Sequence, residues 1–241
     1  MAIYLIGTVH VDPQISSRLE QALDLLKPQT IFVEGCSKMQ SFIDATRAKA
    51  KQSIDEAFVK CEWTEETKNK VKNSIFGPDL SIAEFSAVRE YASKRGIYWH
   101  GLDTNEFIAL VCDAVLSLIP PFCKYIIKKF SEADAQKELA DMHGKDMPNI
   151  EALYHQFDNP EKKATLSAVP FEMLGERDQQ WEQIIRKEYQ KNPDANIAVI
   201  AGHAHIMELG NRTLYDRIKD LKPKRAILPE ATKGNYREQE L

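Results

Sequence analysis

The chain has 241 residues, of which 43% are hydrophobic, and a net charge of −4. This is enough apolar material for a globular core, and the missing basic excess argues against a general nucleic-acid-binding protein. The cysteines show no Cys-x-x-Cys spacing, so neither a zinc knuckle nor a redox pair is indicated. The first residues lack the basic region of a signal peptide, and we therefore expect a cytoplasmic protein.

Apolar runs alternate with segments of helical periodicity, which predicts an α/β fold. The expected strands span residues 3–8, 30–34, 97–102, 196–201 and 225–228. The expected helical stretches span residues 14–26, 39–73, 81–95, 170–189 and 206–221. Short crossovers between continuously apolar strands are typical of a parallel sheet that is covered on both faces. We expect one domain over residues 1–241, with a mostly parallel central sheet flanked by helices.

Residues 105–165 lack strand character and are predicted to form a helical insertion between the third and fourth strands. The longest apolar run extends from Phe107 to Cys123, but Asp113 and the Pro120-Pro121 pair interrupt it. It is also shorter than the roughly 20 residues that a membrane helix needs. We therefore expect a buried or partner-facing helix and no membrane contact, and its apolar surface is compatible with a homodimer.

Two similar turns follow buried strands almost two hundred residues apart. Each has a glycine with a histidine three residues later, His10 after Gly7 and His205 after Gly202. Glu34 and Asp103 stand at the ends of two other predicted strands. Ligands of open α/β sheets bind outside the carboxyl ends of the strands. The sequence thus predicts one site containing His10, Glu34, Asp103 and His205, and we expect the strands before His10 and Glu34 to be neighbours.

Two imidazoles and a carboxylate can hold a divalent cation such as zinc, manganese or cobalt while leaving a position for water. The best candidates for metal ligands are His10, Glu34 and His205. If the second turn stays extended, His203 and His205 point to opposite sides, and we expect His205 to face the site with His203 at its rim. His100 lies within a strand and is expected in the core.

Other charged residues admit both a structural and a functional interpretation. Glu176, Arg177 and Asp178 could be surface charge on a helix. In the functional interpretation, Arg177 clamps a substrate carboxylate or an oxyanion, Glu176 orients a ligand or water, and Asp178 stands behind a ligand, as Asp103 could. Glu84 completes a predicted capping box with Ser81. The same residues also suit a metal-free site in which a histidine is the general base and Glu34 holds its tautomer.

Several of these segments together resemble the TraB/PrgY/GumN family, which is related to the Tiki metalloproteases and to erythromycin esterase-like and ChaN-like proteins. The segments are Leu5 to His10, Val33-Glu34, Glu84-Phe85, Glu176 to Asp178 and Val199 to Ile206. The resemblance implies an α/β fold with a split central sheet and, for the Tiki branch, a peptidase that depends on manganese or cobalt. By position, His10, Glu34 and His205 match the metal residues and Arg177 the family's arginine.

Two positions depart from the family's pattern. His203 replaces a small residue inside the second turn, and Thr104 stands where many members have an arginine. Both departures concern the substrate pocket more than the metal centre. We expect a metal-dependent hydrolase that acts on peptides. The alternatives are a protein that binds and sequesters a peptide without cleaving it, as proposed for the pheromone-shutdown members, and a metal-free esterase with a histidine base.

Overall fold

A computed structural model of the chain describes residues 2–10, 12–75, 83–137, 149–155, 171–210 and 212–238. It contains two compact units. The sheet unit consists of Met1–Cys36, Leu80–Thr104 and Pro148–Leu241, and the helical unit consists of Ser37–Asp79 and Asn105–Met147. The helical unit therefore differs from the expected insertion at 105–165, because it also takes residues 37–79 and ends before residue 148.

Five parallel strands form one sheet in the order β3-β2-β4-β1-β5. The strands are β1 (Ala2–Thr8), β2 (Thr30–Val33), β3 (Tyr98–Gly101), β4 (Asn196–Gly202) and β5 (Lys224–Ile227). Strands β2 and β4 are buried along nearly their whole length, as their continuous apolar runs predict. The expected α/β fold with a parallel sheet is confirmed. His100 is exposed, not in the core, because β3 is an edge strand.

Strand β4 lies between β1 and β2, which corrects the expectation that the strands before His10 and Glu34 are neighbours. β1 and β4 pair over their full length, ending with Thr8 opposite Gly202, and β2 pairs with the other edge of β4. β4 is buried from Ile197 onward, because it is the central strand and the sheet is covered on both faces there. The first βαβ unit is thus split by a strand from the far end of the chain.

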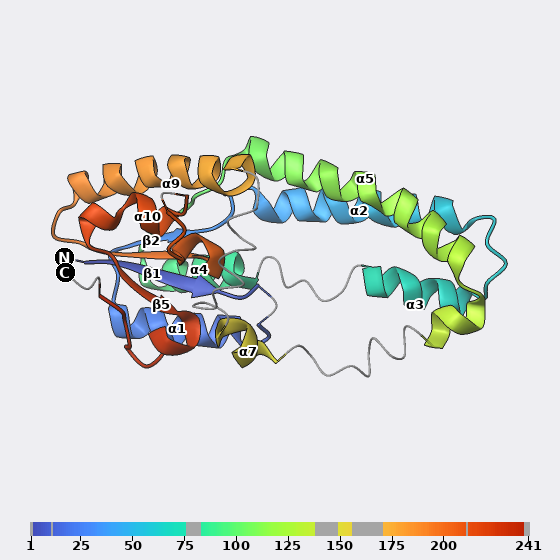
Figure 1. Cartoon of the computed structure of the whole chain (residues 1–241), viewed down its shortest axis with the longest axis horizontal. Coiled ribbons are helices and arrows are strands. Elements are labelled where there is room, and N and C mark those ends of the chain that lie inside the picture. Colours follow the sequence, from blue (N-terminus) through green and yellow to red (C-terminus); the bar gives the residue numbers. More distant parts are fainter. Residues whose placement is uncertain are drawn as a thin grey trace. The chain divides into compact units, whose positions relative to one another are not determined.

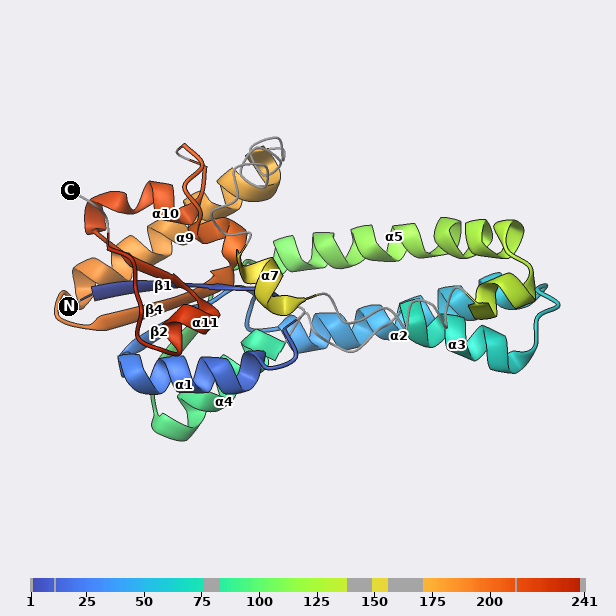
Figure 2. The same cartoon turned by 60° about the horizontal axis from the view of Figure 1, so that its bottom comes forward.

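Helices cover both faces of the sheet (Figure 1, Figure 2). Figure 2 shows α1 (Ile15–Leu26) and α4 (Ala83–Arg95) on one face, and α9 (Phe171–Lys191) and α10 (Leu214–Arg217) on the other. Helix α1 is amphipathic and buries Ile15, Leu19 and Leu23 at helical spacing. The short helices α7 (Ile150–His155) and α11 (Leu228–Ala231) also belong to this unit.

The segment after β4 does not form the single helix that was expected over 206–221. It forms a 3₁₀ turn, η2 (His203–Ile206), then α10, and then a second 3₁₀ turn, η3 (Lys219–Leu221). Helix α10 begins with a capping box in which the Thr213 side chain accepts from the Asp216 N–H and the Asp216 side chain accepts from the Thr213 N–H. Gly210, which precedes this cap, has a positive φ that does not fit a helix. The segment therefore forms several short helical turns in place of one helix.

The helical unit contains α2 (Met39–Phe58), α3 (Glu65–Ile75) and α5 (Asn105–Lys129). The stretch expected to be helical over 39–73 is therefore two helices. Helices α2 and α5 lie side by side (Figure 1, Figure 2). The core of the helical unit, to which α3 also contributes, consists of Ala50, Ile54, Phe58, Cys61, Val71, Ile119 and Cys123. Residues 37–79 join this unit because α5 covers the apolar face of α2.

Helix α5 is longer than the sequence predicted. It runs for 25 residues, with Pro120 and Pro121 inside it, and by length and composition it could cross a membrane. In the apolar 18-residue window of this helix, 17% is buried. The prolines therefore interrupt the apolar run without ending the helix.

Candidate active site

Four strand exits bring titratable side chains to one edge of the sheet. His10 follows β1, Glu34 follows β2, Asp103 follows β3, and His205 lies in the turn after β4. Parallel strands end at the same edge, so residues remote in sequence meet there. The main-chain N–H of Glu34 donates to Ile200 O over 2.8 Å, which holds the end of β2 beside β4.

His10 is oriented by Glu84, which lies in the first turn of α4. The His10 Nδ1–H donates to the Glu84 carboxylate, with both oxygens at 2.8 Å. The Glu84 side chain is 7% exposed and that of His10 is 45% exposed. Burial alone would lower the pKa of His10, but the hydrogen bond and charge of Glu84 outweigh it and raise the pKa from 6.5 to about 9. The sequence pattern had suggested a cap for Glu84, and Ser81, the other half of that box, lies outside the described residues.

His205 is oriented in the same way by Asp178 of α9. Its Nδ1–H donates to Asp178 Oδ1 over 2.5 Å, and the other oxygen of Asp178 accepts the N–H of Leu214. The ring of Trp181 packs against the imidazole with centroids 4.5 Å apart. Burial raises the pKa of Asp178, with the His205 ring opposing this rise. In both pairs a carboxylate holds Nδ1 and Nε2 is turned toward Glu34, and the Nε2 of His205 also lies 3.4 Å from Arg177 Nη1.

Glu34 stands between the two imidazoles. Its Oε2 is 3.8 Å from His10 Nε2, and its Oε1 is 3.8 Å from His205 Nε2. The Gly202 N–H donates to Oε2 over 2.6 Å. Burial alone would raise the pKa of Glu34, but the charges of Arg177 and of the two histidines hold it well below its usual range. Glu34 therefore stays a carboxylate at neutral pH.

Arg177 of α9 donates hydrogen bonds to two carboxylates. Its Nε and Nη2 donate to the two oxygens of Asp103, each over 2.6 Å, and Nη2 also donates to Glu34 Oε1 over 2.7 Å. Its guanidinium lies 4.5 Å from the ring centroid of Trp181. Asp103 also accepts from the Trp181 indole and from the Gly35 N–H. Arg177 is thus occupied in holding Glu34, which disfavours the expected role of a clamp for substrate.

Glu176 does not join the cluster: its side chain is exposed. Successive residues of a helix point about 100° apart, so Arg177 and Asp178 can both face the sheet while their neighbour faces solvent. The expected role of Glu176 in orienting a ligand has no support in the position of its side chain.

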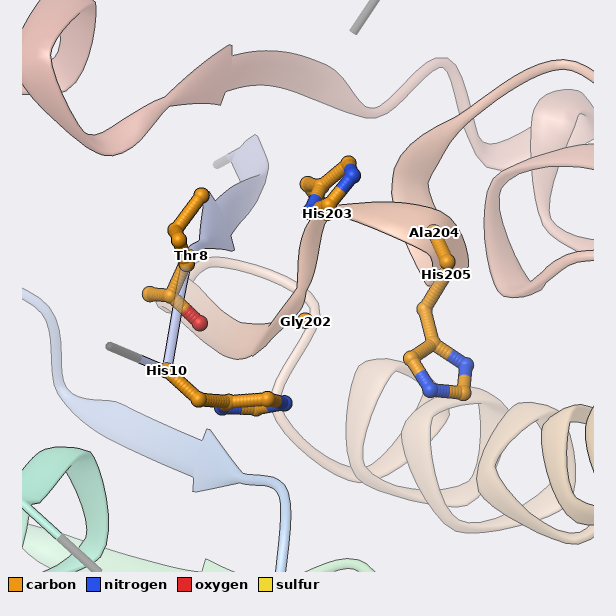
Figure 3. A pocket seen from close by; sticks show the side chains of 7 residues that line it. Thr8, His10, Gly202, His203, Ala204 and His205 are labelled. Carbon is orange, nitrogen blue, oxygen red and sulfur yellow. The ribbon is translucent and has the colours of Figure 1, made fainter. Parts of the chain in front are cut away.

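A pocket of about 310 Å³ opens beside the two histidines. Its lining consists of Thr8, Val9, His10, Gly202, His203, Ala204 and His205. Figure 3 shows the rings of His10 and His205 turned toward a common space, whereas the ring of His203 points away from both. The turn is a 3₁₀ turn, so helical geometry separates the two rings instead of the alternation expected for an extended chain.

Gly202 leaves room for the cluster. A Cβ atom at this position would lie 3.0 Å from His10 Nε2 and 3.3 Å from Glu34 Oε2. A larger residue would make these two side chains give way by a few tenths of an ångström. The glycine of the second turn thus lies in close approach to the candidate ligands.

The donor chemistry of the cluster suits a divalent cation. Metal-bound histidines usually donate their second ring N–H to a carboxylate, which is the arrangement of both His10 and His205. The cluster contains the carboxylates of Glu34, Glu84, Asp103 and Asp178 and the guanidinium of Arg177, which contacts Glu34 and Asp103. Its charge is −3 when both imidazoles are neutral and −2 when His10 is protonated, as its raised pKa favours at neutral pH. Within the described residues, however, no three His, Cys, Asp or Glu side chains meet at the spacing of a formed metal site.

No protein-family model, curated protein or solved structure matches the chain. The candidate site is therefore assigned from its geometry and chemistry.

Asp103→Ala should lower the free energy of unfolding by about 3–5 kcal/mol, because it leaves the buried Arg177 cation without its bidentate partner. Urea denaturation followed by circular dichroism measures this change. Glu90→Ala is the matched control, since it removes a carboxylate from the exposed pair with Lys94 and should leave stability unchanged. Equal stability of the two variants would contradict a structural role for the Asp103–Arg177 pair.

Proposed function

We propose that the protein is a metal-dependent hydrolase in which His10, Glu34 and His205 hold a divalent cation. The observation that carries this proposal is the pair of imidazoles, each held by a carboxylate at Nδ1, with Nε2 atoms 3.8 Å from opposite oxygens of Glu34. The surplus of negative charge in the cluster supports a bound cation. A cation there would polarise a carbonyl group and lower the pKa of a bound water.

The chain's own residues have distinct tasks in this proposal. Glu84 and Asp178 fix the ring orientation of the two histidines, and Arg177 fixes the Glu34 carboxylate. His10 is the partly exposed member of the cluster, so water and substrate reach the site from its side. A peptide substrate and a preference for manganese or cobalt rest on the family resemblance.

The purified 241-residue protein, stripped with a chelator and reloaded with Mn²⁺, should bind the ion and cleave members of a peptide library. His10→Ala and His205→Ala should each abolish both properties, whereas His100→Ala, an exposed histidine on β3, should change neither. Titration calorimetry measures binding, and mass spectrometry of the digest measures cleavage. Undiminished activity of His10→Ala would refute the mechanism. A peptide that is bound tightly but recovered intact would identify a sequestering protein instead.

Glu84→Gln should weaken Mn²⁺ binding by roughly 10–100-fold, as expected for loss of a carboxylate behind a ligand histidine. The substituted amide keeps the size of the side chain, and circular dichroism checks that the fold is retained. Glu90→Gln, on the exposed side of the same helix, is the control and should bind the ion like the wild type. Equal affinities of both variants would mean that His10 is not a ligand.

The His10–Glu84 pair also favours a second candidate, a metal-free hydrolase in which His10 is the general base. Because the pKa of His10 is raised to about 9, His10 would be protonated at pH 7 and a poor base there. This candidate predicts chelator-resistant hydrolysis of ester substrates, with kcat/KM rising with pH until about 9. A chelator-sensitive rate, or a profile already flat at pH 7, would exclude this mechanism.

A further inference from the structure

The turn that carries His10 is bonded to a helix from a remote part of the chain. The Asp12 N–H donates to Val9 O over 2.9 Å, so His10 lies between the two ends of a closed turn. Figure 2 shows α7 beside the end of β1, from which this turn starts. Of the six residues of α7, all of which the structure describes, Tyr154 alone is buried, with an exposed fraction of 0%. Tyr154 is therefore the side chain by which α7 enters the core of the sheet unit.

The Tyr154 hydroxyl bonds to both ends of this turn. It accepts the N–H of Val9 over 3.4 Å, and it donates to Asp12 Oδ2 over 3.0 Å. Val9 and Asp12 are both buried, so water does not compete for these hydrogen bonds. One hydroxyl group thus holds the main chain on either side of His10.

The Asp12 carboxylate has further partners at the start of α1. Its Oδ1 accepts the Gln14 N–H over 2.8 Å, and its Oδ2 also accepts from Arg18 Nη1 over 3.0 Å. Burial and the charge of Asp12 raise the pKa of Tyr154, so its hydroxyl stays a neutral donor. Without this hydroxyl, Asp12 would keep two partners. Its loss should therefore loosen the turn without unfolding the protein.

His10 depends more on its main chain than His205 does. The His205 side chain is 6% exposed and packs against Trp181, whereas that of His10 is 45% exposed. The bond from Nδ1 to Glu84 fixes the direction of the His10 ring, but the turn fixes the point from which the ring extends. A displacement of the turn would therefore move His10 Nε2 relative to Glu34.

We propose that Tyr154 is a positioning residue of the candidate active site, whose hydroxyl holds the His10 turn so that Nε2 of His10 faces Glu34. This inference rests on the proposed function insofar as His10 is a metal ligand. The position of His10 is a separate property that can be measured without metal. Distances between a metal and its ligands are set within about 0.2 Å, so a displaced His10 would bind a cation less tightly.

Tyr154→Phe removes the hydroxyl and keeps the ring, and its circular dichroism should match that of the wild type. Titration calorimetry with Mn²⁺ alone should show roughly 10-fold weaker binding, the lower end of the effect expected when a ligand loses its support. Tyr91→Phe is the matched control and should bind Mn²⁺ like the wild type. Tyr91 is 5% exposed, and its hydroxyl donates to Asp24 Oδ1 over 3.1 Å, which joins α4 to the far end of α1.

The NMR signals of ¹³C-labelled histidine rings report the position of His10 in metal-free protein. His10→Ala and His100→Ala identify the signals of these two residues. The His10 signal should move in Tyr154→Phe and stay in place in Tyr91→Phe, and the signal of His100, which is exposed on β3, should move in neither.

These two measurements separate the role of Tyr154 from the proposed function. A His10 signal that is identical in Tyr154→Phe and in the wild type would overturn the proposal. Undiminished Mn²⁺ affinity of Tyr154→Phe, beside a wild type that binds the ion, would also overturn it. If the wild type binds no Mn²⁺, the metal-dependent hydrolase is refuted, and the His10 signal alone decides whether Tyr154 positions His10.

Discussion

The buried guanidinium of Arg177 is the interaction on which the rest of the site depends. It joins α9 to the ends of β2 and β3 through Glu34 and Asp103. A cation in this position needs carboxylate partners, since an unpaired buried charge is strongly unfavourable. Because Arg177 fixes one oxygen of Glu34 and the Gly202 N–H fixes the other, the carboxylate is held between two imidazoles.

The two histidines have similar chemistry but different surroundings. Each donates Nδ1–H to a carboxylate and presents Nε2 to Glu34. The His10 side chain is 45% exposed, whereas that of His205 is 6% exposed and packs on Trp181. His205 thus lies on the buried side of the site, and His10 lies on the side that is open to solvent. Such an arrangement suits a centre that must hold a ligand and admit water.

The helical unit shows that composition alone does not determine the surroundings of an apolar helix. α5 has enough apolar surface for a buried helix, a membrane helix or an interface helix. Its contacts with α2 account for one face, and the other face carries exposed apolar residues at helical spacing. The charged residues of α2 matter here because the two helices share a core and must occupy the same environment.

The sequence by itself determined the strands and the chemistry at their ends. Continuous apolar runs predicted all five strands, and residues after strand ends predicted that His10, Glu34, Asp103 and His205 share an edge. Only the tertiary structure decided that β4 separates β1 from β2, that Glu84 serves His10, and that Glu176 faces solvent. The reason is physical: local periodicity sets which segment is a strand or a helix, but strand order and carboxylate–histidine pairing depend on packing between segments far apart in the chain.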